Sequence, residues 1–218
     1  MKKEFDKDYY ECGIETGKSC YQSYRWMPEA TMAMAMSIID ALDIKPRHTI
    51  LDYGCAKGYL VKALRILHRK AWGVDISEYA ISQVDKETNG YCTTLGEFNN
   101  GCGFPKHFDF CIAKDVFEHI PKEELCELLQ NINVDKMFVV VPLGDNGKYF
   151  APANDLDVTH IICEDQWWWR RLFQENGWRV TSMNPVMKGV KDSYTEAYPS
   201  AHGFYFLDRD RFYEAGVT

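Results

Sequence analysis

The feature that most constrains the fold is an alternation of two patterns that begins after residue 48. Short apolar runs at residues 49–53, 71–75, 108–113 and 137–141 alternate with longer segments whose apolar residues keep helical spacing. Near-continuous apolar runs of this length are typical of strands that are buried on both faces of a parallel sheet. Because parallel strands need crossover connections, the alternation predicts an α/β fold with helices on both faces of the sheet.

The rest of the chain completes this prediction. A weak third strand is expected near residues 91–95, and residues 178–186 and 203–207 are expected to pair as a terminal hairpin. The fold class is then α/β: a doubly wound, mostly parallel seven-stranded sheet with an antiparallel last strand. We expect residues 1–45, which are rich in aromatic residues and methionine, to form a helical N-terminal cap on the domain formed by residues 46–218.

Composition narrows the class of function. The formal net charge is −7, which disfavours binding to a phosphate backbone, so no nucleic-acid partner is expected. No apolar run approaches the length of about 18 residues that spans a bilayer, and the charged N-terminus does not resemble a secretory signal. No two of the eight cysteines are closer than eight positions, so neither a disulfide framework nor a Cys-x-x-Cys site is expected. These features predict a cytoplasmic protein with reduced thiols and no membrane partner.

The segment that carries chemical information is the turn at residues 54–58, between a predicted strand and a predicted helix. Glycine lets the backbone approach a ligand closely, and a helix N-terminus presents free N–H groups. A phosphate-binding P-loop would need Gly-Lys-Ser/Thr, but here Lys57 precedes Gly58 and Tyr59 follows it. The Gly-x-Gly-x-x-Gly spacing of dinucleotide-binding folds is also absent. S-adenosylmethionine is the third ligand type that such a turn can bind.

Four motifs in order resemble those of the class I, Rossmann-like methyltransferases that use S-adenosylmethionine, and the resemblance covers roughly residues 49–207. The first family motif, Leu-Asp-x-Gly-x-Gly-x-Gly, corresponds to Leu51-Asp52-Tyr53-Gly54-Cys55-Ala56-Lys57-Gly58, in which Ala56 replaces the middle glycine. The others correspond to the acid Asp75 at the end of the second strand, to Gly96-Glu97-Phe98, and to the stretch at residues 114–120. Each lies at the carboxyl end of a predicted strand, the edge where open α/β sheets bind ligands.

The resemblance implies roles for these residues. Asp75 would accept hydrogen bonds from both ribose hydroxyls, and Glu97 would accept one from the adenine amino group. The full set of cofactor-binding residues that we expect is Asp52, Gly54, Cys55, Ala56, Gly58, Asp75, Ile76, Glu97, Phe98, Lys114, Asp115 and Val116. The alternative for Asp75 is an acid that caps the next helix, although Ser77 suits that position better.

The acceptor is less well defined by the sequence. The chain lacks the Asn/Asp-Pro-Pro-Tyr/Phe motif of amino-methylating DNA enzymes and the Pro-Cys nucleophile of cytosine C5 enzymes. Residues 21–29 resemble a leader found on bacterial methyltransferases, some of which are encoded near surface-polysaccharide genes. We therefore expect a small-molecule or glycan-type acceptor, with Tyr24, Arg25 and Trp26 on the substrate side. The alternative for Arg25 is a surface residue stacked on Trp26.

A second candidate segment lies at residues 154–161 and resembles the Asp-Pro-Thr-His stretch of small-molecule methyltransferases, with Val158 at the proline position. It suggests His160 as a general base and Asp157 as a substrate-side residue. His119 is a second catalytic candidate. For both histidines the alternative is a structural role, such as a hydrogen bond to a backbone carbonyl or a helix cap. No metal site is expected, because Asp155 and Asp157 alone are too few ligands.

The sequence thus predicts a methyltransferase that uses S-adenosylmethionine on a small-molecule or glycan-type acceptor. The alternative is a catalytically inactive module that binds the cofactor and serves as an interaction partner. The leader around residues 21–26 and a long irregular loop at residues 143–163 are expected to close over the methyl donor. In that arrangement Tyr24, Arg25 and His160 would point toward it.

Overall fold

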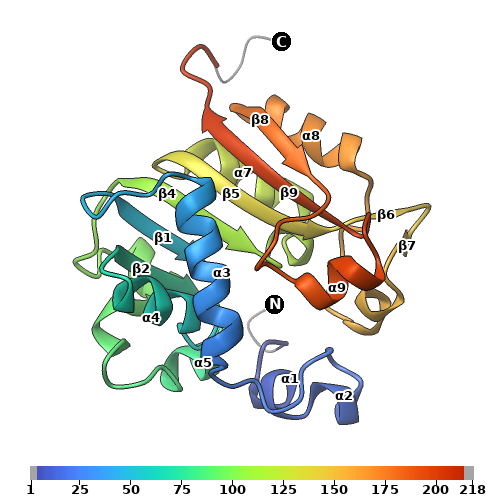
Figure 1. The fold of residues 1–218 in the computed structure, drawn as a ribbon, viewed down its shortest axis with the longest axis horizontal. Helices are drawn as coiled ribbons and strands as arrows, with labels where there is room; N and C mark the ends of the chain where they lie inside the picture. The colour runs from blue at the N-terminus through green and yellow to red at the C-terminus, as the bar shows by residue number, and fades with distance from the viewer. Residues whose placement is uncertain (1–3, 214–218) are drawn as a thin grey trace.

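The computed structural model describes residues 4–213, and a seven-stranded sheet forms its centre (Figure 1). The strands are β1 (Thr49–Tyr53), β2 (Lys70–Asp75), β3 (Cys92–Thr94), β4 (Phe108–Lys114), β5 (Val134–Pro142), β8 (Trp178–Asn184) and β9 (His202–Arg209). Their order across the sheet is β3-β2-β1-β4-β5-β9-β8. Strands β1 to β5 pair in parallel, whereas β9 is antiparallel to both β5 and β8. The predicted sheet with an antiparallel last strand is therefore confirmed.

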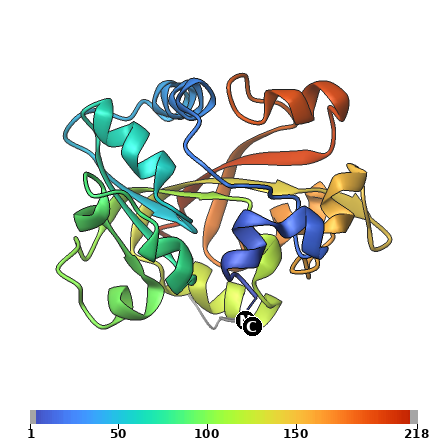
Figure 2. The ribbon, with the colours of Figure 1, turned by 90° about the horizontal axis from the view of Figure 1, so that it is seen from below.

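Helices cover both faces of this sheet, as expected for parallel strands joined by crossovers. The α-helices are α1 (Lys7–Glu11), α2 (Gly13–Thr16), α3 (Pro28–Ala41), α4 (Tyr59–Ile66), α5 (Glu78–Ser82), α6 (Leu95–Asn99), α7 (Lys122–Asn131), α8 (Gln166–Glu175) and α9 (Asp192–Ala197). Short 3₁₀ turns are η1 (Asn89–Tyr91), η2 (Phe117–His119) and η3 (Pro152–Leu156). Seen edge-on, α3 and α4 lie on one side of the sheet and α7 lies on the other (Figure 2).

The two faces have separate cores. Beneath α3 and α4, the buried side chains Ile38, Val61 and Leu64 pack in one cluster with Phe138 of the sheet. On the opposite face, α7 and α8 supply a cluster that includes Leu125, Leu129, Trp169 and Phe173. Burying an aliphatic or aromatic side chain of this size contributes about 1.5–3 kcal/mol. The sheet is thus held from both sides, which leaves its strand ends as a fixed platform for a site.

The predicted N-terminal cap has two parts. Helix α3 begins with Pro28 at its first position and lies on the sheet, where it shares a core cluster with α4. Helices α1 and α2 lie instead in front of the carboxyl ends of the strands (Figure 2). The domain boundary between residues 45 and 46 stays a prediction, because α3 shares its core with the sheet.

The predicted irregular stretch at residues 143–163 contains small elements that the sequence analysis missed. Strands β6 (Gly144–Asp145) and β7 (Lys148–Tyr149) form an antiparallel pair, and η3 follows. Two-residue strands show no period in a sequence, and this is the physical reason for the omission. Helix α9 was missed as well; it is six residues long and follows Lys191, whose φ is +59°.

Within residues 4–213, no helix combines the length and the apolar character that crossing a membrane requires. All eight cysteines are free thiols, and Cys55 and Cys111 are buried.

Candidate functional site

The turn between β1 and α4 brings the backbone close to β2 and to the segment after β4. Gly54 and Gly58 have φ values of +82° and +72°, which favour glycine. A Cβ atom on Gly54 would lie 2.3 Å from the Val116 side chain, so a larger residue would collide there. The N–H groups of Gly54 and Cys55 both donate to the Val74 carbonyl, at 2.8 and 3.0 Å. These hydrogen bonds therefore fix the turn against β2, at the carboxyl ends of the strands.

Asp75, the last residue of β2, holds the middle of this turn. Its Oδ2 accepts a hydrogen bond from the Ala56 N–H at 2.7 Å, and its Oδ1 accepts one from the Ser77 N–H at 2.8 Å. Burial raises the pKa of Asp75, although these backbone N–H donors oppose the rise. Each carboxylate oxygen has a second lone pair, so Asp75 keeps the capacity to accept two further donors.

Ala56 shows why the family motif has a glycine at its position. Its φ is +49°, a left-handed conformation that costs a residue with a Cβ about 1–2 kcal/mol. The hydrogen bond from Ala56 to Asp75 offsets part of this cost. Replacement of the glycine therefore leaves the shape of the turn in place.

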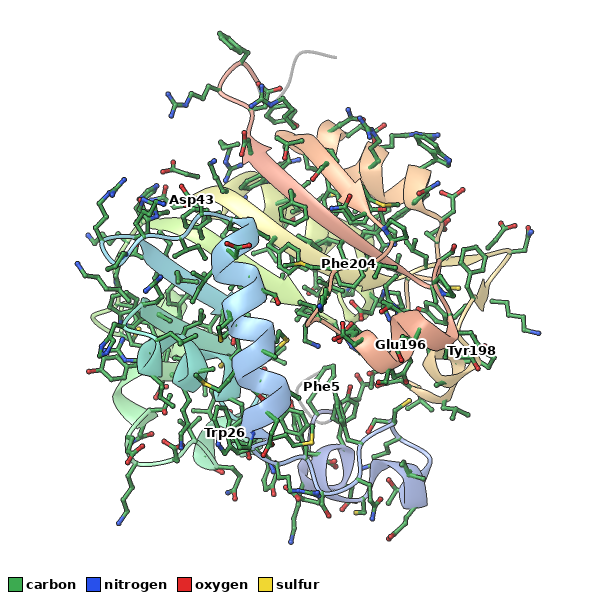
Figure 3. All side chains as sticks on the ribbon, viewed as in Figure 1. Phe5, Trp26, Asp43, Glu196, Tyr198 and Phe204 are labelled. Atoms are coloured by element: carbon green, nitrogen blue, oxygen red, sulfur yellow. The ribbon has the colours of Figure 1, made fainter. Side chains whose placement is uncertain are left out.

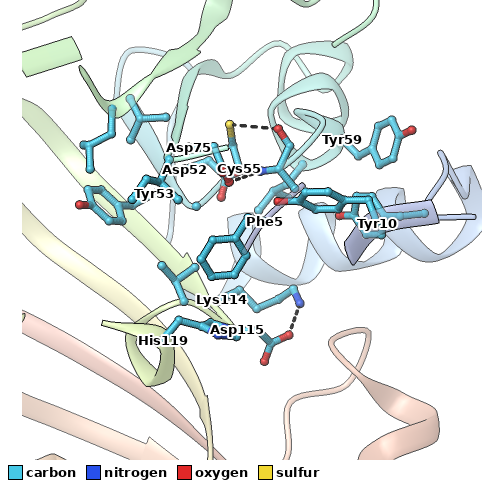
Figure 4. A pocket seen from close by; sticks show the side chains of 18 of the residues that line it. Phe5, Tyr10, Asp52, Tyr53, Cys55, Tyr59, Asp75, Lys114, Asp115 and His119 are labelled. Atoms are coloured by element: carbon cyan, nitrogen blue, oxygen red, sulfur yellow. Dashed lines mark hydrogen bonds and ion pairs between the residues drawn. The ribbon is translucent and has the colours of Figure 1, made fainter. Parts of the chain in front are cut away.

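A pocket opens beside the turn, at the carboxyl ends of β1, β2 and β4 (Figure 4). The sheet order reverses direction between β1 and β4, and this is where open α/β sheets bind ligands. Nine of the expected cofactor-binding residues line it: Asp52, Gly54, Cys55, Ala56, Asp75, Ile76, Lys114, Asp115 and Val116. Gly58 belongs to the turn but not to the lining.

Aromatic rings from the N-terminal segment roof the pocket. Phe5, Tyr9, Tyr10, Tyr21 and Tyr24 all line it. Figure 3 places Phe5 between the N-terminal helices and the sheet, and Figure 4 shows its ring between the Asp52–Cys55 end and the Lys114–His119 end of the pocket. The Phe5 carbonyl accepts a hydrogen bond from Ser77 Oγ at 2.6 Å. The roof is thus attached to the loop that follows β2.

Two further contacts tie this segment to the glycine turn. Lys57 is buried, and its Nζ donates to Glu11 at 2.5 Å and to the Tyr24 carbonyl at 2.7 Å. Tyr79 of α5 also donates to Glu11, at 2.8 Å. The roof and the turn therefore form one connected unit.

The pocket floor carries charged groups with shifted pKa values. Asp52 is only 5% exposed, and burial raises its pKa to about 7. Lys114 opposes this rise and Asp75 adds to it. The Asp52 carboxyl therefore titrates near neutral pH.

Asp115 lies between two lysines at one end of the pocket. Lys114 Nζ contacts its Oδ2 at 2.5 Å, and Lys191 Nζ contacts its Oδ1 at 2.7 Å. Burial by itself would raise the pKa of Asp115, but the two ammonium groups hold that pKa well below its usual range. This ion triplet brings the segment before α9 to the site, a link that the sequence did not reveal.

Behind this end lies a cluster of Glu118, which is buried, with His119 and His160, which are partly buried. Nε2 of His160 and Nε2 of His119 lie 3.9 and 4.0 Å from Glu118 Oε1, and the two imidazole rings are 4.7 Å apart. Burial lowers the pKa of His119 to about 4 and also lowers that of His160, so both rings are neutral at pH 7. Burial raises the pKa of Glu118 well above its usual range.

Besides Gly58, two more expected cofactor residues lie outside the pocket lining. The Glu97 carboxylate accepts hydrogen bonds from the hydroxyls of Thr93 and Thr94, at 2.6 and 3.2 Å, in a capping box at the start of α6. Phe98 packs in the core beside Phe108. Leu95 lines the pocket at this point, so the adenine contact of Glu97 stays a prediction.

Of the expected substrate-side residues of the leader, only Tyr24 lines the pocket. Arg25 is exposed and is not among the lining residues. Trp26 packs against Tyr59 of α4, with ring centroids 5.8 Å apart. The expectation that Arg25 points toward the methyl donor stays a prediction.

Asp157 and the two histidines also differ in position. Asp157 is buried, and it accepts hydrogen bonds from the Tyr9 hydroxyl at 2.8 Å and the Thr159 hydroxyl at 2.5 Å. His119 lines the pocket, whereas His160 lies behind it and contacts His119. The structure thus brings both catalytic candidates together, with only His119 at the wall.

Sequence reasoning overlooked several residues of the site. Phe5, Tyr9 and Tyr10 stand in a charged segment without apolar periodicity, so no local signal marks them. Glu118 stood in the motif after the fourth strand, but a lone glutamate usually lies at the surface, and its burial follows only from the fold.

Comparison with known proteins agrees with this architecture. The family model described as "Methyltransferase domain" matches residues 27–183, which is most of the chain. No curated protein sequence is significantly similar to this chain.

Solved structures with a similar fold have low sequence identity. A chain in the complex between the Haloferax volcanii Trm112 methyltransferase activator and a methyltransferase gives a TM-score of 0.62 at 13% identity, over 87% of this chain and 93% of that one. A methyltransferase from Archaeoglobus fulgidus that depends on S-adenosylmethionine gives a TM-score of 0.60 at 15% identity. The match covers 82% of this chain and 94% of that one. Magnesium protoporphyrin IX methyltransferase from Synechocystis, with S-adenosylhomocysteine bound, gives a TM-score of 0.57 at 14% identity. The match covers 83% of this chain and 84% of that one. The family match, the strand order and the glycine turn together show that this chain belongs to the methyltransferase-domain family with the class I fold, and that its cofactor is S-adenosylmethionine.

Proposed function

We propose that this protein transfers the methyl group of S-adenosylmethionine to a small-molecule or glycan-type acceptor, and that the cofactor binds in the pocket beside the glycine turn. The observation that carries the proposal is the pairing of this turn with Asp75 at the switch point of the sheet. The spare lone pairs of Asp75 suit the two ribose hydroxyls. Tyr53, Ile76 and Leu95 supply apolar surface for the adenine ring.

The opposite end of the pocket supports a role in group transfer. The sulfonium of the cofactor supplies an activated methyl group, so the protein mainly has to align the acceptor with it. Lys114, Asp115 and His119 line this end, where a polar acceptor has partners. We propose that the acceptor binds there and that His119 and His160 are the catalytic candidates.

The shape of the pocket supports a small acceptor. Five aromatic residues between Phe5 and Tyr24 line it, and their bulk favours a small acceptor over a polymer. The net charge of −7 argues in the same direction, because a nucleic acid would be repelled. The free cysteines are in keeping with a cytoplasmic location, which we include in the proposal.

The alternative is a module that binds the cofactor without catalysis. It would share the glycine turn and Asp75, but it would not need the charged groups at the far end. The Lys114–Asp115–Lys191 triplet is partly buried, so its desolvation is costly to maintain without a function, and this favours the enzyme.

Calorimetry and turnover separate these possibilities. We expect S-adenosylhomocysteine to bind with about one ligand per chain, and Asp75→Ala to weaken binding at least about tenfold, as for loss of a hydrogen bond to a charged group. Asp135→Ala, which removes an exposed acid far from the pocket, is the matched control. Formation of S-adenosylhomocysteine with a panel of phenols, carboxylic acids, amines and sugars then tests catalysis. Equal binding by both variants would contradict the site, and cofactor binding without turnover on any acceptor class would favour the inactive module.

A further inference from the structure

The cluster behind the pocket has an unusual electrostatic arrangement. Glu118 is completely buried, and neither of its carboxylate oxygens has a hydrogen-bond partner. Its nearest polar neighbours include Nε2 of His119 and Nε2 of His160. A buried carboxylate without donors costs several kcal/mol, so something has to offset its charge.

The hydrogen bonds of the two histidines fix which ring nitrogen carries the proton. His160 Nδ1 lies 2.8 Å from the Asn154 carbonyl oxygen, which can only accept, so Nδ1 carries the hydrogen. In a neutral ring this leaves Nε2 with a free lone pair. This Nε2 atom lies 3.9 Å from Glu118 Oε1.

His119 reaches the same state through a longer chain. The Thr159 hydroxyl donates to Asp157 at 2.5 Å and therefore accepts from His119 Nδ1 at 2.9 Å. The Tyr9 hydroxyl donates to the same Asp157 carboxylate. His119 Nε2 is therefore also a free lone pair close to Glu118. Histidines that bind metals show this pattern, in which the second ring nitrogen donates to an oxygen.

Glu118, His119 and His160 each offer one possible ligand atom, and these three atoms lie within 4.8 Å of one another. A proton on Glu118 satisfies this arrangement poorly, because it serves one neighbour at a time and distances of 3.9–4.0 Å are too long for a hydrogen bond. A single cation, in contrast, can be bound by all three atoms at the same time. Tetrahedral ligand atoms at zinc bond lengths lie about 3.4 Å apart. Side-chain shifts of about one ångström therefore bring the three atoms to metal-binding distance.

From this geometry we propose that Glu118, His119 and His160 bind one divalent transition-metal ion of the zinc class. Two imidazoles and one carboxylate suit such an ion, whereas magnesium and calcium prefer oxygen ligands alone. The sequence analysis expected no metal because it considered only Asp155 and Asp157. The new set joins residues 118 and 119 of η2 to residue 160, which lies 41 positions beyond His119 in the chain.

The position of the ion gives it a role, and this step rests on the proposed function. Three protein ligands leave a coordination position free, and His119 places the ion beside the acceptor end of the pocket. A bound metal lowers the pKa of a coordinated hydroxyl. The acceptor class is then a hydroxyl compound: its O–H proton passes to water, the oxygen–methyl bond forms, and the sulfonium–methyl bond breaks to give a methyl ether and S-adenosylhomocysteine.

Metal binding is tested directly, without an acceptor. The full chain is stripped with a chelator and titrated with Zn²⁺ by calorimetry and with Co²⁺ by visible absorption, which reports nitrogen and oxygen ligands in a low-symmetry site. We expect about one ion per chain, and a loss of affinity of at least about tenfold in Glu118→Gln and His160→Gln. His107→Gln, at an exposed histidine outside the cluster, is the matched control and should bind like the natural protein.

Folding of the variants is checked by thermal unfolding without metal. Glu118→Gln replaces an unpartnered buried carboxylate with a neutral side chain, so the metal-free variant should melt no lower than the natural protein. The proposal is wrong if the natural protein shows no saturable binding, or if both cluster variants bind the ion as tightly as His107→Gln does. Failure of S-adenosylhomocysteine to bind would instead overturn the proposed function and leave the metal result standing.

Discussion

The dependence of folding on pH tests the electrostatics of the pocket floor, and Asp52 is the residue to change. Its pKa is about 7 in the folded protein, compared with 3.8 for an unperturbed aspartate. Burial causes most of this rise. Because the folded protein holds this proton more tightly than the unfolded chain does, the contribution of Asp52 to the free energy of unfolding is largest below about pH 4 and falls as the pH rises to about 7. At about 1.4 kcal/mol per pKa unit, the loss is at most about 4 kcal/mol.

The variant Asp52→Asn keeps the size of the side chain and removes the titration. Urea unfolding of both proteins at intervals from about pH 4 to about pH 8 gives the difference in unfolding free energy at each pH. As the pH rises, we expect the unfolding free energy of the natural protein to fall relative to that of Asp52→Asn by up to about 4 kcal/mol. Above about pH 7, where the folded protein also loses the proton, the difference should level off. Buried histidines such as His202, whose pKa is lowered to about 3 by burial, titrate in both proteins and cancel in the difference. A difference that does not change with pH would refute the reasoning.

Three further predictions concern the turn and the roof. Gly54→Val should abolish binding of S-adenosylhomocysteine in calorimetry, because its side chain meets Val116; Gly101→Val, at an open site with a similar φ of +86°, should bind normally. Ala56→Gly should raise the free energy of unfolding in urea by about 1 kcal/mol, since it relieves a left-handed alanine, and a decrease would show that the turn is not strained. Tyr9→Phe should lower the free energy of unfolding by about 1–2 kcal/mol, because it removes a buried hydrogen bond to Asp157; an unchanged urea midpoint would argue against that bond.

Most of the sheet was predictable because its strands are buried on both faces. The run at residues 49–53 coincides with β1, and the predicted strand at residues 108–113 ends one residue before β4 does. A strand that is buried on both faces has apolar residues at nearly every position, so its sequence is a continuous apolar run. The pair β6–β7 and helix α9 are short elements that tertiary contacts hold in place, so their sequences carry no comparable signal.

The site was predictable only where strand ends define it. Asp52, Asp75 and Lys114 line the pocket as expected, because the carboxyl ends of parallel strands meet at one edge. Arg25 is exposed and does not line the pocket, and its sequence neighbours gave no sign of this because the exposure of a leader residue depends on where the leader docks. The burial of Glu118 depends on the loop at residues 143–163, whose Ile161 and Ile162 N–H groups donate to the Glu118 carbonyl.

From the contacts of the roof, we expect binding of the cofactor in the proposed site to be coupled to docking of the N-terminal segment. Lys57 belongs to the glycine turn, yet its ammonium group is held by Glu11 and by the Tyr24 carbonyl of the roof. Ser77, whose N–H donates to Asp75, also holds the Phe5 carbonyl through its hydroxyl. The groups that shape the cofactor site are therefore the same groups that anchor the roof. Any ligand that stabilises this turn also stabilises the docked roof, and by thermodynamic reciprocity a firmly docked roof strengthens cofactor binding by the same factor.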